Sequence, residues 1–469
     1  MKIPRRVSLP IFLLSAAVSV LWGSAFALKD YVMTDFRAVY YGTRCLLEHH
    51  NPYSVSELER VVANEHGERP SETPEQHQAV SLYVNLPSTF IFVAPFAAVP
   101  FGVARLLWLA LLTCLFLISS FLMFDIGARY APGVSLFLVC LVLVNSQMIF
   151  KGGNTAGVAV PLCLVGVWAF LQERAQQRIV VVGVACMALS LAIKPHDSGL
   201  IWLYFFVAGG VYRRRALQSL AGTVALFFVG LVWVSSIAPH WMKDWNTNLS
   251  VISTHGHIND PGPASIVGFH NLGPVIDLQS ILSVIRDNPS FYNPVTYLVC
   301  GALLSMWAVA SFKSRISKER ALLALAAVTP LTLLITYHRP WDAKLLLLTC
   351  PGCAILWASG RRRRWPALLI TFATLVASGD IGMAIFLAHP ASALESAPGL
   401  TGQIATILLA RPIAVLLVIM SLFYVWAYLR NSRVNAYVPA IEGALDNNSR
   451  MSQPQEVSTA GSPIKGERP

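Results

Sequence analysis

Long runs of apolar residues alternate with short polar segments along most of the chain. Twelve such runs have about the length of a membrane span, and they lie at 9–28, 103–124, 134–150, 155–171, 179–193, 196–211, 216–237, 293–312, 321–337, 343–359, 365–388 and 412–429. They do not alternate residue by residue as the strands of a membrane barrel do. Because backbone groups in lipid need partners within their own segment, the pattern predicts an all-α polytopic membrane protein with about 12 transmembrane helices.

Composition supports the same class of protein. Of the 469 residues, 55% are hydrophobic and only 13% are charged, whereas a soluble domain carries about 25% charged residues. The formal net charge of +11 is concentrated in short clusters between apolar runs, at Arg213–Arg215, Lys313–Arg320 and Arg361–Arg364. This distribution is an orientation signal that predicts cytoplasmic clusters, and it does not indicate a nucleic-acid partner.

Counting spans from these clusters places both termini inside and three polar segments outside. The outer segments are the first loop at 29–102, a second large loop at 238–292 and a short turn at 337–344. Within the first loop, the apolar stretch 87–101 is short and interrupted by prolines. The count puts both of its ends outside, so we expect it to dip into the membrane or lie along it.

The remaining features of the chain favour one membrane domain. Residues Met1–Leu28 resemble a signal peptide, but the run has about span length and lacks a small-x-small cleavage site, which predicts a retained first helix. The 8 cysteines are scattered, mostly within apolar runs, and show no disulfide framework. We therefore expect one transmembrane domain over 1–430, followed by a disordered cytoplasmic tail over 431–469.

A carboxylate stands shortly after the first apolar run. Asp35 begins an amphipathic segment that leads to Asn51-Pro52-Tyr53. A carboxylate held at the membrane surface can accept a proton from a hydroxyl as a general base. Alternatively, Asp35 caps the helix expected to start at Phe36. The residue pattern leaves both roles open.

Further polar residues gather at the outer ends of later spans. His338 and Arg339 lie in the turn 337–344 between two apolar runs, where charge is costly without a use. They are candidates for binding a phosphate. The alternative is an ordinary loop in which Lys344 extends toward the lipid headgroups.

The segment Lys194-Pro195-His196-Asp197 also lies outside between two runs. A lysine there departs from the positive-inside distribution, which makes Lys194 and His196 candidates for contact with substrate. The alternative is that Asp197 is merely the structural partner of Lys194.

Sequence motifs for cofactors are absent or weak. His255, His257 and Asp260 form a His-x-His…Asp set that could bind a metal, but they lie in a Gly/Pro-rich loop of the kind that more often shapes a substrate entrance. We expect neither a metal nor a cofactor. The chain has no Walker loop and no Gly-x-Gly-x-x-Gly turn after a strand, which argues against an ATP-driven pump and against a nucleotide-sugar domain.

Several of these segments occur together in one known family. The segments are Asp35-Phe36…Tyr40-Tyr41…Asn51-Pro52-Tyr53, Tyr83-Val84-Asn85-Leu86-Pro87, Gly152-Gly153-Asn154 and Ala192-Ile193-Lys194-Pro195. Over residues 10–215 the chain resembles glycosyltransferase family 87, and beyond them the likeness is limited to the pattern of spans. That family comprises GT-C-fold membrane mannosyltransferases that use a polyprenyl-phosphate sugar.

The resemblance implies a GT-C-like bundle with an interfacial helix in the first external loop. It implies that Asp35 is the general base of an inverting transfer, on the non-cytoplasmic face of the cell membrane. A hexose, mannose in this family, would move from a polyprenyl-phosphate donor to a lipid-linked or cell-envelope glycan. The implied partners are these substrates and membrane lipids. The candidate substrate-binding residues are Tyr40, Tyr41, Asn85, Asn154, Lys194, His196, His338 and Arg339.

Two other classes of protein fit parts of the pattern. Twelve spans suit a secondary transporter or a flippase, but those folds usually show an internal repeat and polar residues near mid-span. Here the polar residues lie at the outer membrane boundary. A purely structural membrane protein would leave Asp35 and the external charges without a role.

Overall fold

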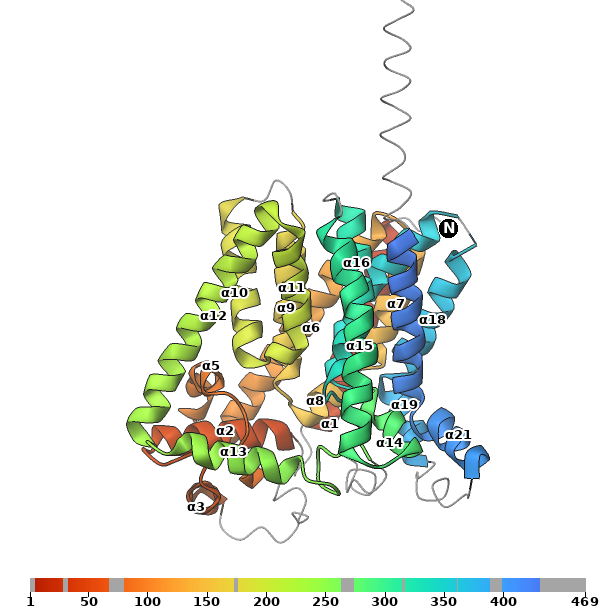
Figure 1. Cartoon of the computed structure of the whole chain (residues 1–469). Coiled ribbons are helices and arrows are strands. Elements are labelled where there is room, and N and C mark those ends of the chain that lie inside the picture. Colours follow the sequence, from red (N-terminus) through yellow and green to blue (C-terminus); the bar gives the residue numbers. More distant parts are fainter. Residues whose placement is uncertain are drawn as a thin grey trace, which may run out of the picture.

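The computed structural model describes residues 5–27, 33–66, 80–172, 176–262, 274–313, 317–360, 362–388 and 399–430. All regular elements within these ranges are helices (Figure 1). They are α1 (Arg5–Ala27), α2 (Thr34–Leu47), α3 (Val55–His66), α5 (Pro87–Ala97), α6 (Phe101–Ala128), α7 (Pro132–Val144), α8 (Met148–Gly152), α9 (Ala156–Phe170), α10 (Gln177–Ile193), α11 (Pro195–Ala208), α12 (Gly210–Ile237), α13 (Trp241–Ile252), α14 (Gln279–Ile285), α15 (Pro289–Phe312), α16 (Lys318–Ile335), the 3-10 helix η2 (Asp342–Leu348), α17 (Thr349–Ala358), α18 (Arg364–Ala377), α19 (Asp380–Ala388), α21 (Gly399–Ala410) and the helix Pro412–Arg430. The predicted tail at 431–469 lies outside the described residues.

Every apolar run identified in the sequence coincides with one helix or two consecutive helices. The run 134–150 forms α7 and α8, 343–359 forms η2 and α17, and 365–388 forms α18 and α19. Among the described residues, 6 helical segments are long and apolar enough to cross a membrane: Ser8–Ala25, Phe101–Ala128, Pro132–Gly152, Gly210–Ile237, Pro289–Phe312 and Pro412–Arg430. The prediction of an all-α, polytopic membrane protein is confirmed.

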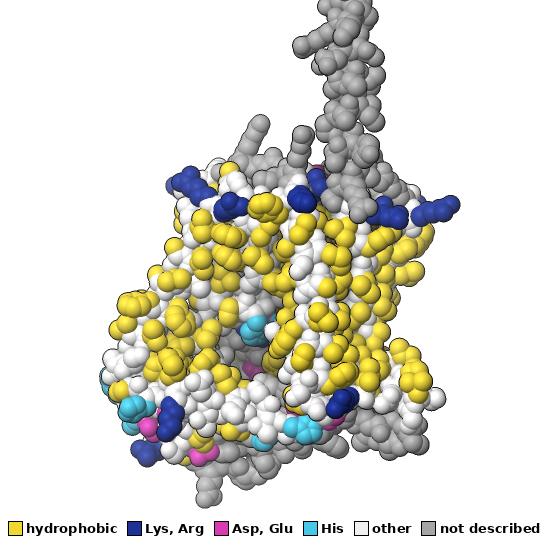
Figure 2. All heavy atoms as spheres, in the orientation of Figure 1, with side chains coloured by type: hydrophobic (Ala, Val, Ile, Leu, Met, Phe, Trp, Pro, Cys, Tyr) yellow, Lys and Arg dark blue, Asp and Glu magenta, His cyan; other side chains and the backbone are white. Residues whose placement is uncertain are grey.

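Burial separates the helices into inner and outer ones. Nearly every side chain of α9, α16 and η2 is buried, as expected for helices that are apolar on all sides and surrounded by others. By contrast, large apolar side chains on α12 and α15 are exposed, with Phe228 63% and Leu298 75% accessible. Figure 2 shows such side chains as a broad apolar belt. Water would oppose this exposure, so lipid covers the belt.

The two ends of the bundle differ in charge. Figure 2 shows lysine and arginine side chains along one rim, at the end where α12 begins and α15 ends (Figure 1). Exposed residues at these helix ends include Arg213, Arg214 and Lys313. We call this end the basic end. It matches the clusters that the sequence predicts to be cytoplasmic.

Short helices close the opposite end, where α2, α5 and α13 lie across the direction of the long helices (Figure 1). At about 1.5 Å per residue, α5 is about 16 Å long, roughly half the thickness of the hydrocarbon core. It begins at Pro87 and is separated from α6 by Pro100. The placement of α5 supports a segment that lies along the membrane.

An aromatic core fixes α2 to the long helix α6. Phe36 stacks on Trp108 with ring centroids 4.7 Å apart, and Tyr41 stacks on Phe101 at 5.8 Å. The hydroxyl of Tyr40 donates to the carbonyl of Val99 at 2.8 Å. The predicted interfacial helix is therefore present. Its packing fixes the position of its first turn, which contains Asp35.

Candidate functional site

Asp35 lies in the first turn of α2. This helix starts at Thr34, and its N-cap residue is Met33, which adopts a left-handed backbone with φ 63°. The N–H of Met33 donates to the carbonyl of Lys151 at 2.8 Å, which ties the start of α2 to α8. The Asp35 carboxylate makes no N-cap bond. Oδ2 accepts instead from Nδ2 of Asn154 at 2.8 Å, so the alternative that Asp35 caps a helix starting at Phe36 is wrong.

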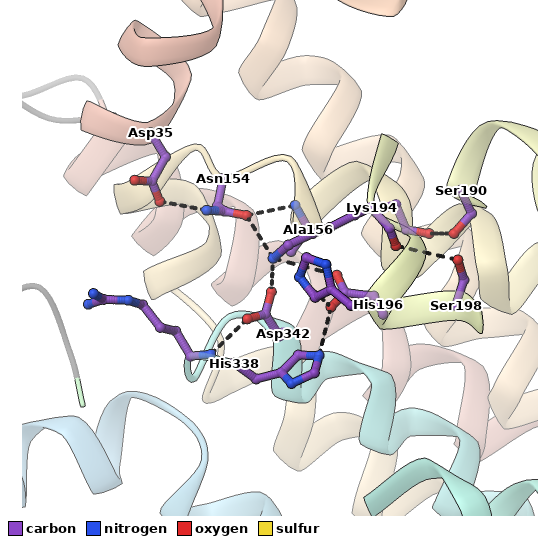
Figure 3. Close-up of polar contacts among 12 residues, drawn as sticks. Asp35, Asn154, Ala156, Ser190, Lys194, His196, Ser198, His338 and Asp342 are labelled. Atoms are coloured by element: carbon purple, nitrogen blue, oxygen red, sulfur yellow. Dashed lines mark hydrogen bonds and ion pairs between the residues drawn. The ribbon is translucent and has the colours of Figure 1, made fainter. Parts of the chain in front are cut away.

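Asn154 joins Asp35 to a cation. It lies in the turn between α8 and α9, where its Oδ1 accepts from the N–H of Ala156 at 2.8 Å and from Nζ of Lys194 at 3.5 Å. Since its amide donates on one side and accepts on the other, Asn154 connects Asp35 to Lys194 (Figure 3).

Lys194 lies at the junction between α10 and α11, and its Nζ contacts two carboxylates. Its Nζ donates to Oδ1 of Asp342 and lies 3.6 Å from Oδ2 of Asp197. Burial alone would lower the pKa of Lys194, but the two carboxylates outweigh burial and raise it. Lys194 is therefore a fixed positive charge.

The loop between α16 and η2 completes the arrangement. Oδ2 of Asp342 accepts from the backbone N–H of Arg339 at 2.7 Å. Arg339 is 2% exposed, and its guanidinium donates to the carbonyl of Ile258 at 2.7 Å. It also lies over the rings of Tyr337 and Trp341, at 5.4 and 5.6 Å from their centroids.

These contacts form one connected group from four parts of the chain, which we call the ionic cluster. Its members are Asp35, Asn154, Lys194, Arg339 and Asp342. Burial raises the pKa of Asp35, while the Asn154 hydrogen bond and the charges of Arg339 and Lys194 lower it in part. A carboxylate with a raised pKa is a stronger base than an ordinary one, so Asp35 is suited to accept a proton from a hydroxyl.

Two histidines lie beside the ionic cluster. His338 is buried, with Nδ1 2.7 Å from the carbonyl oxygen of Thr336 and Nε2 3.3 Å from Oδ1 of Asp197. His196 is more open, with 39% of its side chain exposed, and its Nε2 lies 3.8 Å from the same carboxylate oxygen. The two imidazole centroids are 5.1 Å apart.

The structure thus brings six of the predicted site residues to one region: Asp35, Asn154, Lys194, His196, His338 and Arg339. Tyr40 and Tyr41 do not join them, because both are fully buried in the aromatic core between α2 and α6. Their contacts in this structure are those of packing residues, and contact with substrate stays a prediction. Asn85 lies before α5, where its carbonyl accepts from the hydroxyl of Tyr53 at 2.9 Å.

Lys344 differs from the sequence-based interpretation. It is 4% exposed and does not extend to lipid headgroups, because its Nζ donates to the carbonyls of Asn145 and Ser378 at 3.4 Å each. Asp380 lies near this group and accepts from the N–H groups of Gln147 and Met148, at 2.6 and 2.9 Å. A carboxylate within the predicted run 365–388 was the available signal for this second polar group.

The loop histidines have a structural explanation. Nδ1 of His255 lies 3.1 Å from Asp260, and its Nε2 lies 3.6 Å from Asp287. The carboxylate of Asp260 also accepts from the N–H groups of Gly256 and Gly262, at 2.7 and 3.0 Å. Asp260 thereby holds its own loop in shape.

The surface of the bundle is hollowed between α12 and α15 (Figures 1 and 2). A histidine and an acidic side chain are visible inside this hollow, and apolar side chains flank it on both sides (Figure 2). The hollow therefore connects a polar interior with the lipid-covered belt.

These features define a polytopic helical membrane protein with a partly buried ionic site at the end opposite its basic end. No protein-family model and no curated protein matches the chain. Among solved structures, the chain is similar to the crystal structure of ArnT from Cupriavidus metallidurans bound to undecaprenyl phosphate. The sequence identity is 12% and the TM-score 0.43, and the match covers 97% of this chain and 82% of that chain. A TM-score of this size does not establish a shared arrangement of helices, so the function is inferred from the residues of this chain.

Proposed function

We propose that the protein is a membrane glycosyltransferase of the GT-C type. It transfers a hexose from a polyprenyl-phosphate donor to a lipid-linked or cell-envelope glycan, on the non-cytoplasmic face of the cell membrane. The observation that carries the proposal is the ionic cluster, in which the Asp35 carboxylate is linked through Asn154 to Lys194 at the end opposite the basic end. The resemblance to family 87 favours mannose as the sugar.

The proposed reaction is a single in-line displacement. Asp35 accepts the proton of the acceptor hydroxyl, whose oxygen attacks the anomeric carbon of the donor. The bond from that carbon to the phosphate oxygen breaks, and the polyprenyl phosphate leaves with the electron pair. The configuration at the anomeric carbon inverts. One base suffices, because no covalent sugar–enzyme intermediate forms.

A departing phosphate gains negative charge and is stabilised by positive groups placed in advance. Lys194 and Arg339 supply two such charges close enough to Asp35 to affect its pKa. The acidic side chains of Asp197 and Asp342 hold Lys194 in place before the donor binds. We assign Lys194 and Arg339 to the donor phosphate.

The hollow between α12 and α15 is consistent with a donor that enters the site from the membrane. A polyprenyl chain is apolar and its phosphate is charged, so such a donor needs lipid and polar surroundings side by side. The apolar flanks and the polar side chains within the hollow provide both (Figure 2).

The test is the substitution Asp35→Asn in purified protein supplied with radiolabelled polyprenyl-phosphate mannose and candidate acceptor lipids. Asparagine keeps an oxygen that can accept from Asn154 but cannot take up a proton. Because a general base contributes about 10²–10⁴-fold to a rate, we expect transfer to fall at least about 100-fold. Donor binding should change much less.

The matched control is Asp125→Asn, which removes a partly exposed carboxylate near the end of α6 that pairs with Arg129. This variant should leave transfer unchanged. Transfer by Asp35→Asn at the wild-type rate would contradict the proposed base. Counterflow of a soluble substrate in proteoliposomes, without sugar transfer, would favour the secondary transporter.

A further inference from the structure

We propose that His196, Asp197 and His338 form a binding site for a divalent transition-metal ion such as Zn²⁺. The three potential ligand atoms are Nε2 of His196, Oδ1 of Asp197 and Nε2 of His338. They come from the start of α11 and from the loop before η2, and all lie within 4.8 Å of one another. Two imidazoles and one carboxylate are ligands that Zn²⁺ commonly takes.

The buried ligand atoms of this group make no hydrogen bond of good geometry within the described part of the chain, and their nearest polar contacts are the ion pairs of Asp197 with Lys194 and His338. These buried atoms are Nε2 of His338 and both carboxylate oxygens of Asp197, and both side chains are 0% exposed. Polar atoms left this way inside a protein are costly. His338 and Asp197 face each other across 3.3 Å, close to the roughly 3.4 Å between two ligand atoms of a tetrahedral zinc site.

The second nitrogen of His338 favours the same interpretation. Nδ1 lies 2.7 Å from the carbonyl oxygen of Thr336, and a carbonyl can only accept, so Nδ1 carries the proton. With Nδ1 protonated, Nε2 is the ring nitrogen that faces Asp197, and it can bind either a proton shared with that carboxylate or a metal ion. Metal-bound histidines are usually oriented by a hydrogen bond of this kind from the other ring nitrogen.

The charge of Lys194 does not occupy the carboxylate oxygen proposed as a metal ligand. Lys194 approaches Asp197 at Oδ2, whereas the two histidines approach Oδ1. Lys194 also donates to Asp342, which balances part of its charge. Access is available from the side of His196, since 39% of that side chain is exposed.

The loop group around His255 provides a useful contrast. Asp260 in that group already accepts two backbone N–H groups, so its carboxylate is satisfied without an ion. His255 is 50% exposed at its side chain. His255→Ala therefore serves as a matched control that removes a histidine from a similar-looking group on the same protein.

The experiment measures the metal content of the protein and requires no sugar transfer. Its outcome is therefore independent of whether the protein is a glycosyltransferase. Purified full-length protein is stripped with a chelator, dialysed against Zn²⁺ and analysed by mass spectrometry of the metal. Co²⁺ replaces Zn²⁺ in a parallel sample, because its visible absorption reports tetrahedral coordination. We expect about one ion per chain.

His196→Ala is the main variant, because His196 is partly exposed and substitutions at such positions change stability little. Asp197→Asn and His338→Ala extend the test to the buried ligands. Loss of an outer-shell partner typically weakens metal binding about 10–100-fold, so loss of a direct ligand should weaken it at least about 100-fold. His255→Ala should bind as wild type does.

Three results would overturn the site: wild type without metal, metal retained by His196→Ala, or equal loss from His255→Ala. In the first case, the space between His338 and Asp197 holds a proton, and the pair is a buried imidazolium and carboxylate.

Discussion

Asn154 positions the carboxylate of Asp35 and favours its ionised form. Its amide donates to Oδ2 of Asp35 at 2.8 Å, and its carbonyl oxygen is held by the N–H of Ala156 at 2.8 Å. The orientation of the amide is therefore set by the backbone of α9. A donor fixed in this way stabilises the ionised form of the carboxylate.

Replacing Asn154 by alanine should shift the pH dependence of transfer. Burial raises the pKa of Asp35, and the Asn154 hydrogen bond is the largest influence that lowers it. Without this bond the pKa of Asp35 rises further. Because a base acts in its deprotonated form, the acidic limb of the pH–rate profile should move to higher pH. The measurement is the transfer rate of Asn154→Ala and of wild type as a function of pH.

Asn246→Ala is the control, since Asn246 is exposed on α13 at the same end of the molecule. Its profile should match that of wild type. A reduced rate with an unmoved acidic limb in Asn154→Ala would mean that Asn154 acts only on substrate position.

At the scale of elements, the turn between α8 and α9 determines how closely the start of α2 can pack against that turn. Gly153 has φ +63°, and a Cβ built there would lie 2.9 Å from Cβ of Phe36 and 3.2 Å from Cβ of Met33. Its carbonyl accepts from Nε1 of Trp108 at 2.9 Å. Both the backbone conformation and the space require glycine.

Gly153→Ala should therefore destabilise the protein and displace α2. A non-glycine residue in a strained backbone region costs about 1–3 kcal/mol, and the contact with Phe36 adds to this. We expect a lower melting temperature in a thermal unfolding measurement, together with reduced transfer. In Gly199→Ala on α11, the new Cβ meets nothing within 4 Å, so helix stability should rise by about 0.5–1 kcal/mol. Equal melting temperatures for the two variants would contradict this account.

The helices could be predicted from the sequence far better than the contacts between them. Apolar runs identify spans because any segment in lipid needs apolar side chains and a helix that satisfies its own backbone groups. The burial of Lys344 and Tyr40 could not be predicted, because a lysine near a span end and a tyrosine in an amphipathic helix look the same in the sequence whether they are buried or open. Lys194 was found because its charge departs from the distribution along the chain. Its bond to Asp342 depends on packing that no local pattern encodes.

For the whole molecule, the charge difference between the two ends predicts its orientation in the membrane. Lys313, after α15, and Lys243, on α13, are both exposed and lie at opposite ends of the bundle. In the variant Lys243→Cys, a membrane-impermeant maleimide added to intact cells should label the new thiol. In Lys313→Cys, labelling should require permeabilised membranes.

The parent protein is the control for its own 8 cysteines, and the measurement is the mass shift of the labelled chain. Labelling of Lys313→Cys but not Lys243→Cys in intact cells would place the ionic cluster on the cytoplasmic side and overturn the proposed location of the reaction.

The hollow between α12 and α15 also determines how any lipid ligand would find the protein. A molecule that enters from the apolar belt diffuses in two dimensions, and its effective concentration is its mole fraction among the surrounding lipids. Adding inert detergent would dilute the ligand among the lipids. Binding of the ligand would then become slower even when its amount per volume of solution is unchanged. Occupancy in a cell would follow the crowding of the bilayer and the supply of carrier lipid more closely than any concentration in water.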